Sequence, residues 1–142
     1  MKIYFAGSIR GGRSEEDIYP QIINHLINYG EVLTEHIGQM DIEKIEKNNL
    51  DNYIFNRDIA WLKSSNVLVA DVTAPSLGVG YEIGIAETLN IPILCLYNLK
   101  NKKMLSAMLS GNENLFCRKY KNIIEAKFLI DDFFINIVKN IK

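Results

Sequence analysis

At 142 residues the chain is long enough for one domain, and its 48% of hydrophobic residues is enough for a packed core. The net charge of −1 excludes the broad positive field needed to bind a nucleic-acid polymer, but it allows a local site for a small anion. The two cysteines are too few for a disulfide framework, the two histidines show no metal-ligand spacing, and no apolar run is long enough to cross a membrane. We therefore expect a cytoplasmic protein without a signal peptide, membrane contact, metal or organic cofactor.

Apolar runs and helical patterns alternate along the chain. They predict a strand at 2–6, a helix at about 15–28, a strand at 31–34 and a helical region at about 42–64. A near-continuous apolar strand at 66–72 is followed by a helix at about 78–89, a strand at 92–97, a short helix at 102–109, an edge strand at 115–120 and a final helix at about 123–141. This order predicts an α/β fold over 1–142, a single domain with a doubly wound parallel sheet of about five strands in a flavodoxin-like, Rossmann-like arrangement.

The segment directly after the first strand has the composition of an anion-binding loop. It reads AGSIRGGR from Ala6 to Arg13, where glycines let backbone N–H groups approach an anion, Ser8 adds a hydroxyl, and Arg10 or Arg13 adds positive charge. The spacing matches neither a Walker A loop nor a dinucleotide fingerprint, so ATP and dinucleotides are poor candidates. Two interpretations stay open, a phosphate cradle and a flexible turn with solvated arginines.

A second glycine-rich loop follows the third strand and leads into a helix. It reads APSLGVGYEIG from Ala74 to Gly84. Ligands of open parallel sheets bind at the carboxyl ends of strands, so this loop and the first one are expected to face one crevice. A phosphate or ribose fits between the two loops. Ser76 has an equally good interpretation as a helix N-cap, with Gly78 and Gly80 allowing close packing.

Glu82 is the carboxylate that the second loop brings to this crevice. Its burial there costs free energy unless the carboxylate is used, and the dipole of its own helix favours the ionised form. We therefore predict a low-pKa nucleophile aimed at a sugar carbon. Asp58, in the second helical region, is either a partner carboxylate at the roughly 5 Å separation typical of retaining glycosidases or the ion-pair partner of Arg57 or Lys63.

Three further side chains have both a functional and a structural interpretation. Tyr4 lies near the end of the first strand, where its hydroxyl either points at Glu82 or belongs to a packed core tyrosine. Asp71 ends the third strand, where a turn or capping role is favoured over a catalytic one. His36 follows the second strand and either stacks on a base or is merely structural.

Taken together, these segments resemble the 2′-deoxynucleoside 5′-monophosphate N-hydrolases, which belong to the nucleoside 2-deoxyribosyltransferase superfamily. The matching segments are KIYFAGSIRGGR at the start, VLTEHIG after the first helix, RDIAWLKSSNVLVADVTAPSLGVGYEIG in the middle and LSAML later. The resemblance spans most of the chain, up to about residue 109.

The resemblance implies cleavage of the N-glycosidic bond of a 2′-deoxynucleoside 5′-monophosphate without a cofactor. Glu82 would attack C1′ and form a covalent glycosyl-enzyme, Asp58 would be the second catalytic carboxylate, and Tyr4 would position the nucleophile. The implied substrate-binding residues are Gly7, Ser8, Ile9, Arg10 and Gly11 for the 5′-phosphate, Ser76, Gly78 and Gly80 for phosphate and sugar, and His36 for the base. Ser106 and Met108 match residues that the family supplies from a neighbouring subunit, which implies a homodimer that binds a small-molecule nucleotide.

Three other functions stay open on the sequence. A nucleoside 2-deoxyribosyltransferase would share Glu82 but would not need a 5′-phosphate loop. A ribonucleoside 5′-monophosphate N-hydrolase would differ at the sugar, where Tyr4 favours deoxyribose. A nucleotide-binding sensor without catalysis would keep the loops but would leave Glu82 and Asp58 without chemistry.

Overall fold

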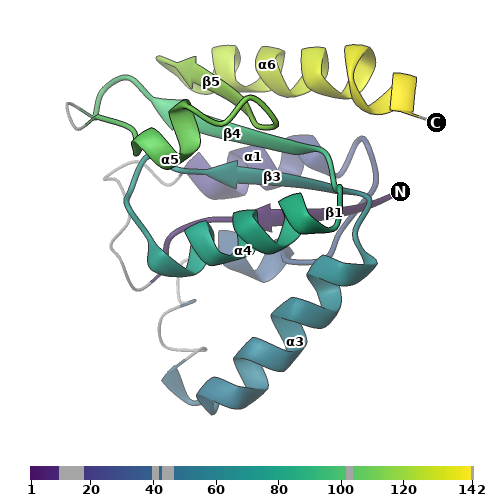
Figure 1. Ribbon diagram of the computed structural model, residues 1–142, viewed down its shortest axis with the longest axis vertical. Helices are drawn as coiled ribbons and strands as arrows, with labels where there is room; N and C mark the ends of the chain where they lie inside the picture. Colours follow the sequence, from purple (N-terminus) through teal and green to yellow (C-terminus); the bar gives the residue numbers. More distant parts are fainter. Residues whose placement is uncertain (10–17, 40–41, 43–46, 102–103, 142) are drawn as a thin grey trace.

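The computed structural model describes residues 1–9, 18–39, 42, 47–101 and 104–141 (Figure 1). Within these ranges, five parallel strands form one sheet in the order β2-β1-β3-β4-β5. The strands are β1 (Lys2–Ala6), β2 (Glu31–Val32), β3 (Val67–Asp71), β4 (Ile93–Asn98) and β5 (Phe116–Tyr120). This order confirms the α/β fold and the flavodoxin-like strand order expected from the sequence. In the same part of the chain, no helix combines the length and apolar character needed to cross a bilayer.

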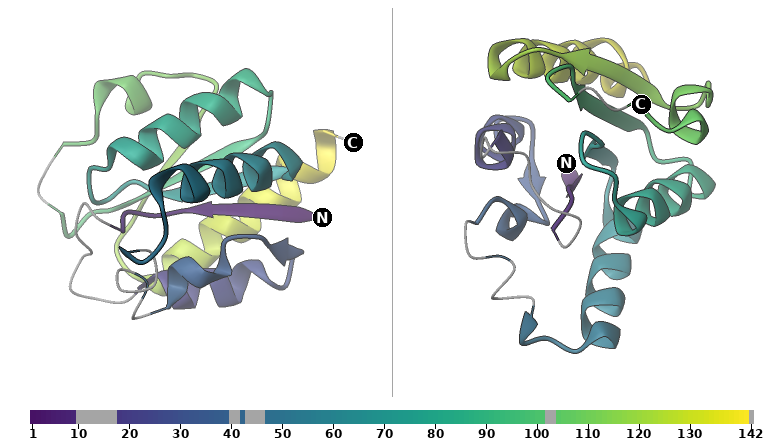
Figure 2. Two further views of the ribbon diagram at one scale, coloured as in Figure 1. Left: turned by 90° about the horizontal axis from the view of Figure 1, so that it is seen from below. Right: turned by 90° about the vertical axis from the view of Figure 1, so that its left-hand side faces the viewer.

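Helices cover both faces of the sheet, as the right-hand view of Figure 2 shows. One face packs against α1 (Ile18–Leu26), α6 (Ile123–Asn136) and the short helices η1 (Glu35–Gly38) and η2 (Val138–Ile141). The other face packs against α4 (Leu77–Thr88), the end of α3 (Asp51–Ser64) and the short α5 (Ala107–Ser110) with its flanks. The far end of α3 projects beyond the sheet (Figures 1 and 2).

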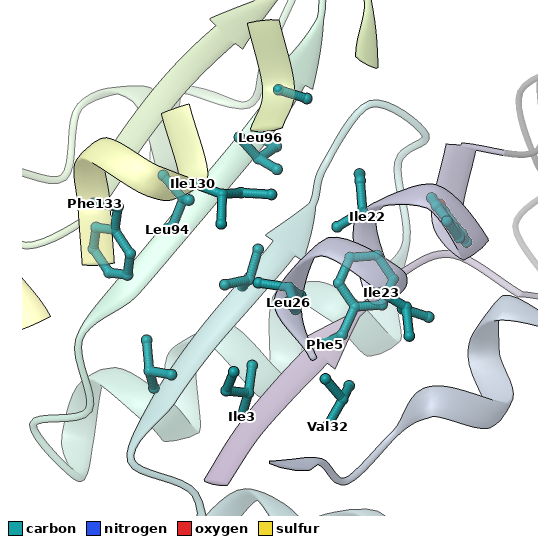
Figure 3. Packing of buried hydrophobic residues seen from close by; sticks show 14 of the residues in the cluster. Ile3, Phe5, Ile22, Ile23, Leu26, Val32, Leu94, Leu96, Ile130 and Phe133 are labelled. Atoms are coloured by element: carbon teal, nitrogen blue, oxygen red, sulfur yellow. The ribbon is translucent and has the colours of Figure 1, made fainter. Parts of the chain in front are cut away.

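Two separate cores follow from the alternation of side chains along each strand. The core under α1 and α6 is drawn in Figure 3, where strand residues such as Phe5 and Leu96 meet Ile22 and Leu26 of α1 and Ile130 of α6. The core on the other face contains the intervening strand residues together with side chains of α3 and α4, among them Tyr4, Ala70, Leu62 and Ile83. Odd-numbered residues of β1 and β3 thus point into the core under α1 and α6, and even-numbered residues point into the core under α4. The position of a polar residue in a strand therefore determines the face of the sheet on which it lies.

The expected element bounds need correction at several places. The second strand ends at Val32 because the Thr34 hydroxyl takes over, accepting from Phe5 N at 2.8 Å and donating to Phe5 O at 2.7 Å. The region 42–64 is not one helix, since Asn48 and Asn49 form a turn before α3 begins at Asp51. The short helix is reduced to Ala107–Ser110, and α6 stops at Asn136 before η2. Residues 15–17, 43–46 and 102–103 of these predictions lie outside the described residues.

Asp71 confirms the turn role favoured from the sequence. Its side chain is 2% exposed and lies at the end of β3, where Oδ1 accepts from Thr73 N at 3.1 Å and Oδ2 accepts from the Tyr120 hydroxyl at 2.7 Å. Burial raises the pKa of Asp71, and the bonds from Tyr120 and Thr73 oppose that rise. This pair ties β3 to β5 across β4.

We expect Tyr120→Phe to lower the free energy of unfolding by about 1–3 kcal/mol, because it leaves a buried carboxylate oxygen without its donor. Urea denaturation followed by circular dichroism measures the change. Tyr97→Phe is the matched control, since that hydroxyl donates to the neutral Asn101 carbonyl and should cost only about 0.5–1 kcal/mol. Equal losses in the two variants would contradict the special role of the Asp71–Tyr120 pair.

Candidate active site

A cavity of about 590 Å³ opens at the carboxyl ends of β1 and β3. Its walls come from the loop after β1, the loop after β3, the start of α4, one face of α3 and η1. The two loops predicted to face one crevice therefore do so, as expected where neighbouring parallel strands end at the same edge of a sheet. The cavity brings together Gly7, Ile9, His36, Asp58, Ser76, Gly78 and Glu82 from the sequence predictions.

Tyr4 and Glu82 form the central contact of this cavity. The Tyr4 hydroxyl donates to Glu82 Oε1 at 2.6 Å, from the middle of β1 to the second turn of α4. Tyr4 is fully buried in the core under α4, while Glu82 is half-buried and lines the cavity. Of the two interpretations of Tyr4, its hydroxyl does point at Glu82, and its ring is also part of the core. Burial and the Glu82 carboxylate raise the pKa of Tyr4, so the phenol keeps its proton as a donor.

The prediction of a low-pKa carboxylate at Glu82 is wrong. Burial raises the pKa of Glu82 from its ordinary value of 4.5 to about 7, the bond from Tyr4 opposes that rise, and the nearby Asp58 charge adds to it. The helix dipole does not prevent this, because Glu82 is the sixth residue of α4 and the dipole acts mainly within the first turn. Glu82 is thus poised between its protonated and ionised forms near neutral pH.

Asp58 stands on α3 across the cavity from α4. It is paired with Arg57, whose Nε donates to Asp58 Oδ1 at 2.8 Å, and both side chains line the cavity. The ion pair with Arg57 is therefore present, and Asp58 also lines the cavity that contains Glu82, while the separation of roughly 5 Å stays a prediction. Carboxylates from α3 and α4 on one cavity can stabilise positive charge on a ligand atom between them.

The loop after β1 is held from behind by α1. Ser8 N donates to the Tyr19 hydroxyl at 3.1 Å, and the Tyr19 ring lies so close to Gly7 that a Cβ there would come within 2.7 Å of it. Ser8 is fully buried, and its Oγ has no hydrogen-bond partner among the described residues. Ile9 is half-buried and lines the cavity. The predictions for Arg10 and Gly11 lie outside the described residues.

The loop after β3 has both roles that the sequence allowed. Ser76 caps α4, because its Oγ accepts from Val79 N at 3.3 Å, and it also lines the cavity with Gly78. Gly80 is exposed on α4 and does not belong to the cavity wall. Apart from its chain neighbours and the backbone of its own helix, no atom of the described residues lies within 4 Å of a Cβ placed at Gly80.

Of the remaining predicted residues, one lines the cavity and two lie outside it. His36, in η1, lines it, and its ring centre is 5.4 Å from that of Trp61. Ser106 and Met108 are exposed and lie outside the cavity of their own chain, with Ser106 Oγ accepting from Met108 N as the cap of α5.

Sequence reasoning overlooked the aromatic side of the cavity and the support of its loop. Phe55 of α3 and Tyr81 of α4 line the cavity, with ring centres 6.3 Å apart. Both are exposed aromatics on helices, and Tyr81 directly precedes Glu82, a signal that was available in the sequence. Tyr19 looks in the sequence like an ordinary core residue of a helix, and only its position behind Gly7 reveals its role.

We expect Glu82→Gln to stabilise the fold at pH 8 and to leave its stability unchanged at pH 4. The pKa of about 7 lies above the ordinary 4.5, so the folded protein binds the proton more tightly, and the free energy of unfolding falls as pH rises from about 4.5 to about 7. Glutamine imitates the protonated form and escapes this loss, which is at most about 3 kcal/mol for a pKa raised from 4.5 to about 7. Urea denaturation at both pH values, at one protein concentration, measures the difference.

Glu87→Gln is the control for this prediction. Glu87 lies on the same helix, is partly exposed and lies outside the cavity, and its hydrogen bonds from Asn114 and Asn112 lower its pKa, so its replacement brings no gain at pH 8. A gain in Glu82→Gln that was the same at pH 4 and pH 8 would contradict the raised pKa.

Comparison with known proteins assigns the chain to a family. Residues 3–131 match the family model for nucleoside 2-deoxyribosyltransferase. A Danio rerio protein named 5-hydroxymethyl-dUMP N-hydrolase is 45% identical over 144 residues, which cover 99% of this chain and 100% of the relative. A Nematostella vectensis protein, provisionally named 2′-deoxynucleoside 5′-phosphate N-hydrolase 1, is 51% identical over 125 residues, which cover 84% of this chain and 85% of the relative.

A solved structure supports the same fold. The CMP N-glycosidase BcmB of Clostridium botulinum superposes with a TM-score of 0.65 at 18% identity, over 92% of this chain and 99% of that one. The resemblance indicated by the motifs is confirmed by the relatives and by the family model together. The chain therefore belongs to the nucleoside 2-deoxyribosyltransferase family.

Proposed function

We propose that this chain hydrolyses the N-glycosidic bond of 2′-deoxynucleoside 5′-monophosphates and releases a free base and 2-deoxyribose 5-phosphate. The proposal is carried by the Glu82 carboxylate, which Tyr4 holds at 2.6 Å on the wall of a cavity between two loops. Relatives that are 45% and 51% identical bear the names of N-hydrolases of such nucleotides, which supports the same reaction here.

The reaction proceeds in two steps at C1′ of the sugar. Glu82 attacks C1′ through Oε2, since Tyr4 engages Oε1, and the C1′–N bond breaks with its electron pair on the base, which takes up a proton. Water then attacks C1′, the bond between C1′ and Glu82 breaks, the carboxylate is restored, and a proton is released. Both transition states carry positive charge on the sugar, which Glu82 and Asp58 stabilise.

The 5′-phosphate binds at the loop after β1. The Ser8 hydroxyl supports this, because a fully buried hydroxyl without a partner among the described residues is costly until a ligand supplies one. The N-terminus of α4, which begins next to Ser76, adds N–H donors on the same cavity. Phosphate binding energy then orients C1′ against Glu82. Arg10 and Gly11 stay predictions as further phosphate ligands.

The base binds on the aromatic side of the cavity. Phe55, Tyr81 and His36 offer ring faces there, and such faces accept any planar base. Several relatives are named for 5-hydroxymethyl-dUMP, so a pyrimidine with a polar group at carbon 5 is the first substrate to test.

The experiment is incubation of the protein with dUMP, 5-hydroxymethyl-dUMP, CMP and the matching nucleosides, with and without a free acceptor base, followed by chromatography. We expect base release from the deoxynucleotides alone. Base exchange on unphosphorylated nucleosides would instead indicate a transferase, release from CMP a ribonucleotide hydrolase, and tight binding without turnover a sensor. Each of these results would overturn the proposal.

We expect Glu82→Gln to reduce kcat by at least about a thousandfold while KM changes little, because the nucleophile acts only in the chemical step. In the wild type, kcat/KM should rise with pH and level off above an apparent pKa of about 7, since only ionised Glu82 attacks. Initial rates between pH 5 and 9 measure both. Turnover by Glu82→Gln near the wild-type rate would refute the assignment.

We also propose that two copies form a homodimer through the α4 and α5 side, where Ser106 and Met108 of one subunit approach the cavity of the other. Large apolar side chains are exposed on this side, with Leu77 and Met104 both 96% exposed and Met108 82% exposed. A second copy is the occupant that buries them, and the open space beside Gly80 allows its close approach.

We expect Met108→Glu to convert the dimer into monomers and to lower kcat/KM, because a charge would enter the apolar contact. Sedimentation velocity and the base-release assay measure the two effects. Ile124→Glu is the matched control, as Ile124 is 78% exposed on α6, on the opposite face of the sheet. A wild-type protein that sediments as a monomer at assay concentration would contradict the dimer.

We propose a cytoplasmic location as well. Cys95 and Cys117 are opposite each other in the register of β4 and β5, and both are free thiols. Such a pair is maintained in a reducing compartment, which supports the proposal.

A further inference from the structure

Arg57 occupies an unusual place on α3, beside the proposed catalytic carboxylates. Its Nε donates to Asp58 Oδ1 at 2.8 Å, and the two side chains are only 16% and 22% exposed. Its guanidinium carbon lies 4.9 Å from the centre of the Trp61 ring and 5.8 Å from that of Tyr53. Both Arg57 and Asp58 line the cavity that contains Glu82.

Helix geometry explains how this arrangement is held. Tyr53, Arg57 and Trp61 are spaced by four residues, so they form one stripe in which the guanidinium has a ring on each side. Cation–π contacts of this kind fix the planar guanidinium. Consecutive residues of a helix do not normally face each other. The Arg57 side chain must therefore bend sideways out of this stripe to reach the Asp58 carboxylate. The rings therefore hold Arg57, and Arg57 holds Asp58.

We propose that Arg57 is a positioning residue of the hydrolysis. It orients the Asp58 carboxylate toward the reacting sugar, and its positive charge offsets the repulsion between the Asp58 and Glu82 carboxylates. This inference rests on the proposed function of the cavity. A simple surface ion pair does not account for the geometry, because surface pairs are exposed and unconstrained, whereas this pair is mostly buried between rings on the cavity wall.

Two groups act directly on Glu82, the Tyr4 hydroxyl of β1 and the Asp58 carboxylate of α3. The other titratable or charged groups that share its cavity are Asp51 and Arg57 of α3, His36 of η1 and Tyr81 of α4. Asp58 raises the pKa of Glu82, so the cation beside Asp58 favours the ionised nucleophile. Removal of the cation then raises the pH at which Glu82 ionises.

The test is the pH dependence of base release by wild type, Arg57→Gln, Arg57→Lys and Lys63→Gln. For Arg57→Gln we expect kcat at pH 7 to fall about tenfold with KM changed less than about twofold, and the acidic limb of kcat/KM to move up by at least about half a pH unit. Arg57→Lys keeps the positive charge but loses the planar guanidinium group. The acidic limb of kcat/KM should therefore stay at the wild-type pH, while kcat falls several-fold. Lys63→Gln removes an equal charge from an exposed position on α3 and should change neither quantity.

A double-variant comparison shows whether Arg57 acts through Asp58. In an Asp58→Asn background, Arg57→Gln should cost no further activity and move the limb no further. An equal cost in both backgrounds, or a limb of Arg57→Gln that superimposes on that of the wild type, overturns the proposal. If Arg57→Gln does not fold, Arg57→Lys decides, and an unchanged kcat in Arg57→Lys overturns the positioning role.

A second measurement separates this inference from the proposed function. The ¹³C shift of the Glu82 carboxyl, followed by NMR against pH in the nucleotide-free protein, should show a higher midpoint in Arg57→Gln than in the wild type. A wild type that releases no base would remove the proposed function and leave only the effect of Arg57 on the ionisation of Glu82, whereas an unchanged midpoint would remove the role of Arg57 alone.

Discussion

The hydrogen bond from the Tyr4 hydroxyl to Glu82 Oε1 is the interaction on which the site depends. It joins β1 to α4 across 78 positions of the sequence and gives a half-buried carboxylate a fixed donor. Burial raises the pKa of Glu82 to about 7, and the Tyr4 bond is what keeps it from rising further. Burial also raises the pKa of Tyr4, so the donor cannot lose its proton to solvent near neutral pH. A carboxylate in this setting is fixed in direction and weakly solvated, which suits the nucleophile proposed here.

The strand order explains why this contact is available. β1 and β3 are neighbours near the middle of the sheet, so the loops that follow them leave from the same edge and form one cavity. Side-chain alternation then separates the two acidic residues near β3. Asp71 belongs to the layer of α1 and α6, where Tyr120 and Thr73 satisfy it, whereas Glu82 lies with Tyr4 in the layer of α4. The acid at the strand end is buried and hydrogen-bonded within the fold, and the one on the following helix lines the cavity.

Much of this could be predicted from the sequence, and the failures have physical causes. The apolar runs of β1, β3 and β4 fixed the sheet, and the loops that follow the first two placed the cavity. The acidity of Glu82 could not be inferred, because it depends on burial by residues distant in sequence. Tyr19 escaped notice for the same reason, since its contact with Gly7 is tertiary. Asn48 and Asn49 favour a turn before α3, but they stand within a long polar segment that is also compatible with a helix.

The wall formed by α3 is the part of the site that core packing constrains least. Of the fourteen residues in Asp51–Ser64, Leu62 alone is buried, and most of the helix projects beyond the sheet (Figure 2). The packing of α4 against the sheet fixes the positions of Glu82 and Tyr4, whereas the turn of α3 that contains Asp58 buries no side chain. The role proposed for Asp58 requires its carboxylate to be placed to within a fraction of an ångström. Contacts within the helix must therefore fix Asp58, and the stripe of Tyr53, Arg57 and Trp61 supplies them, because residues four apart remain neighbours however the helix as a whole moves.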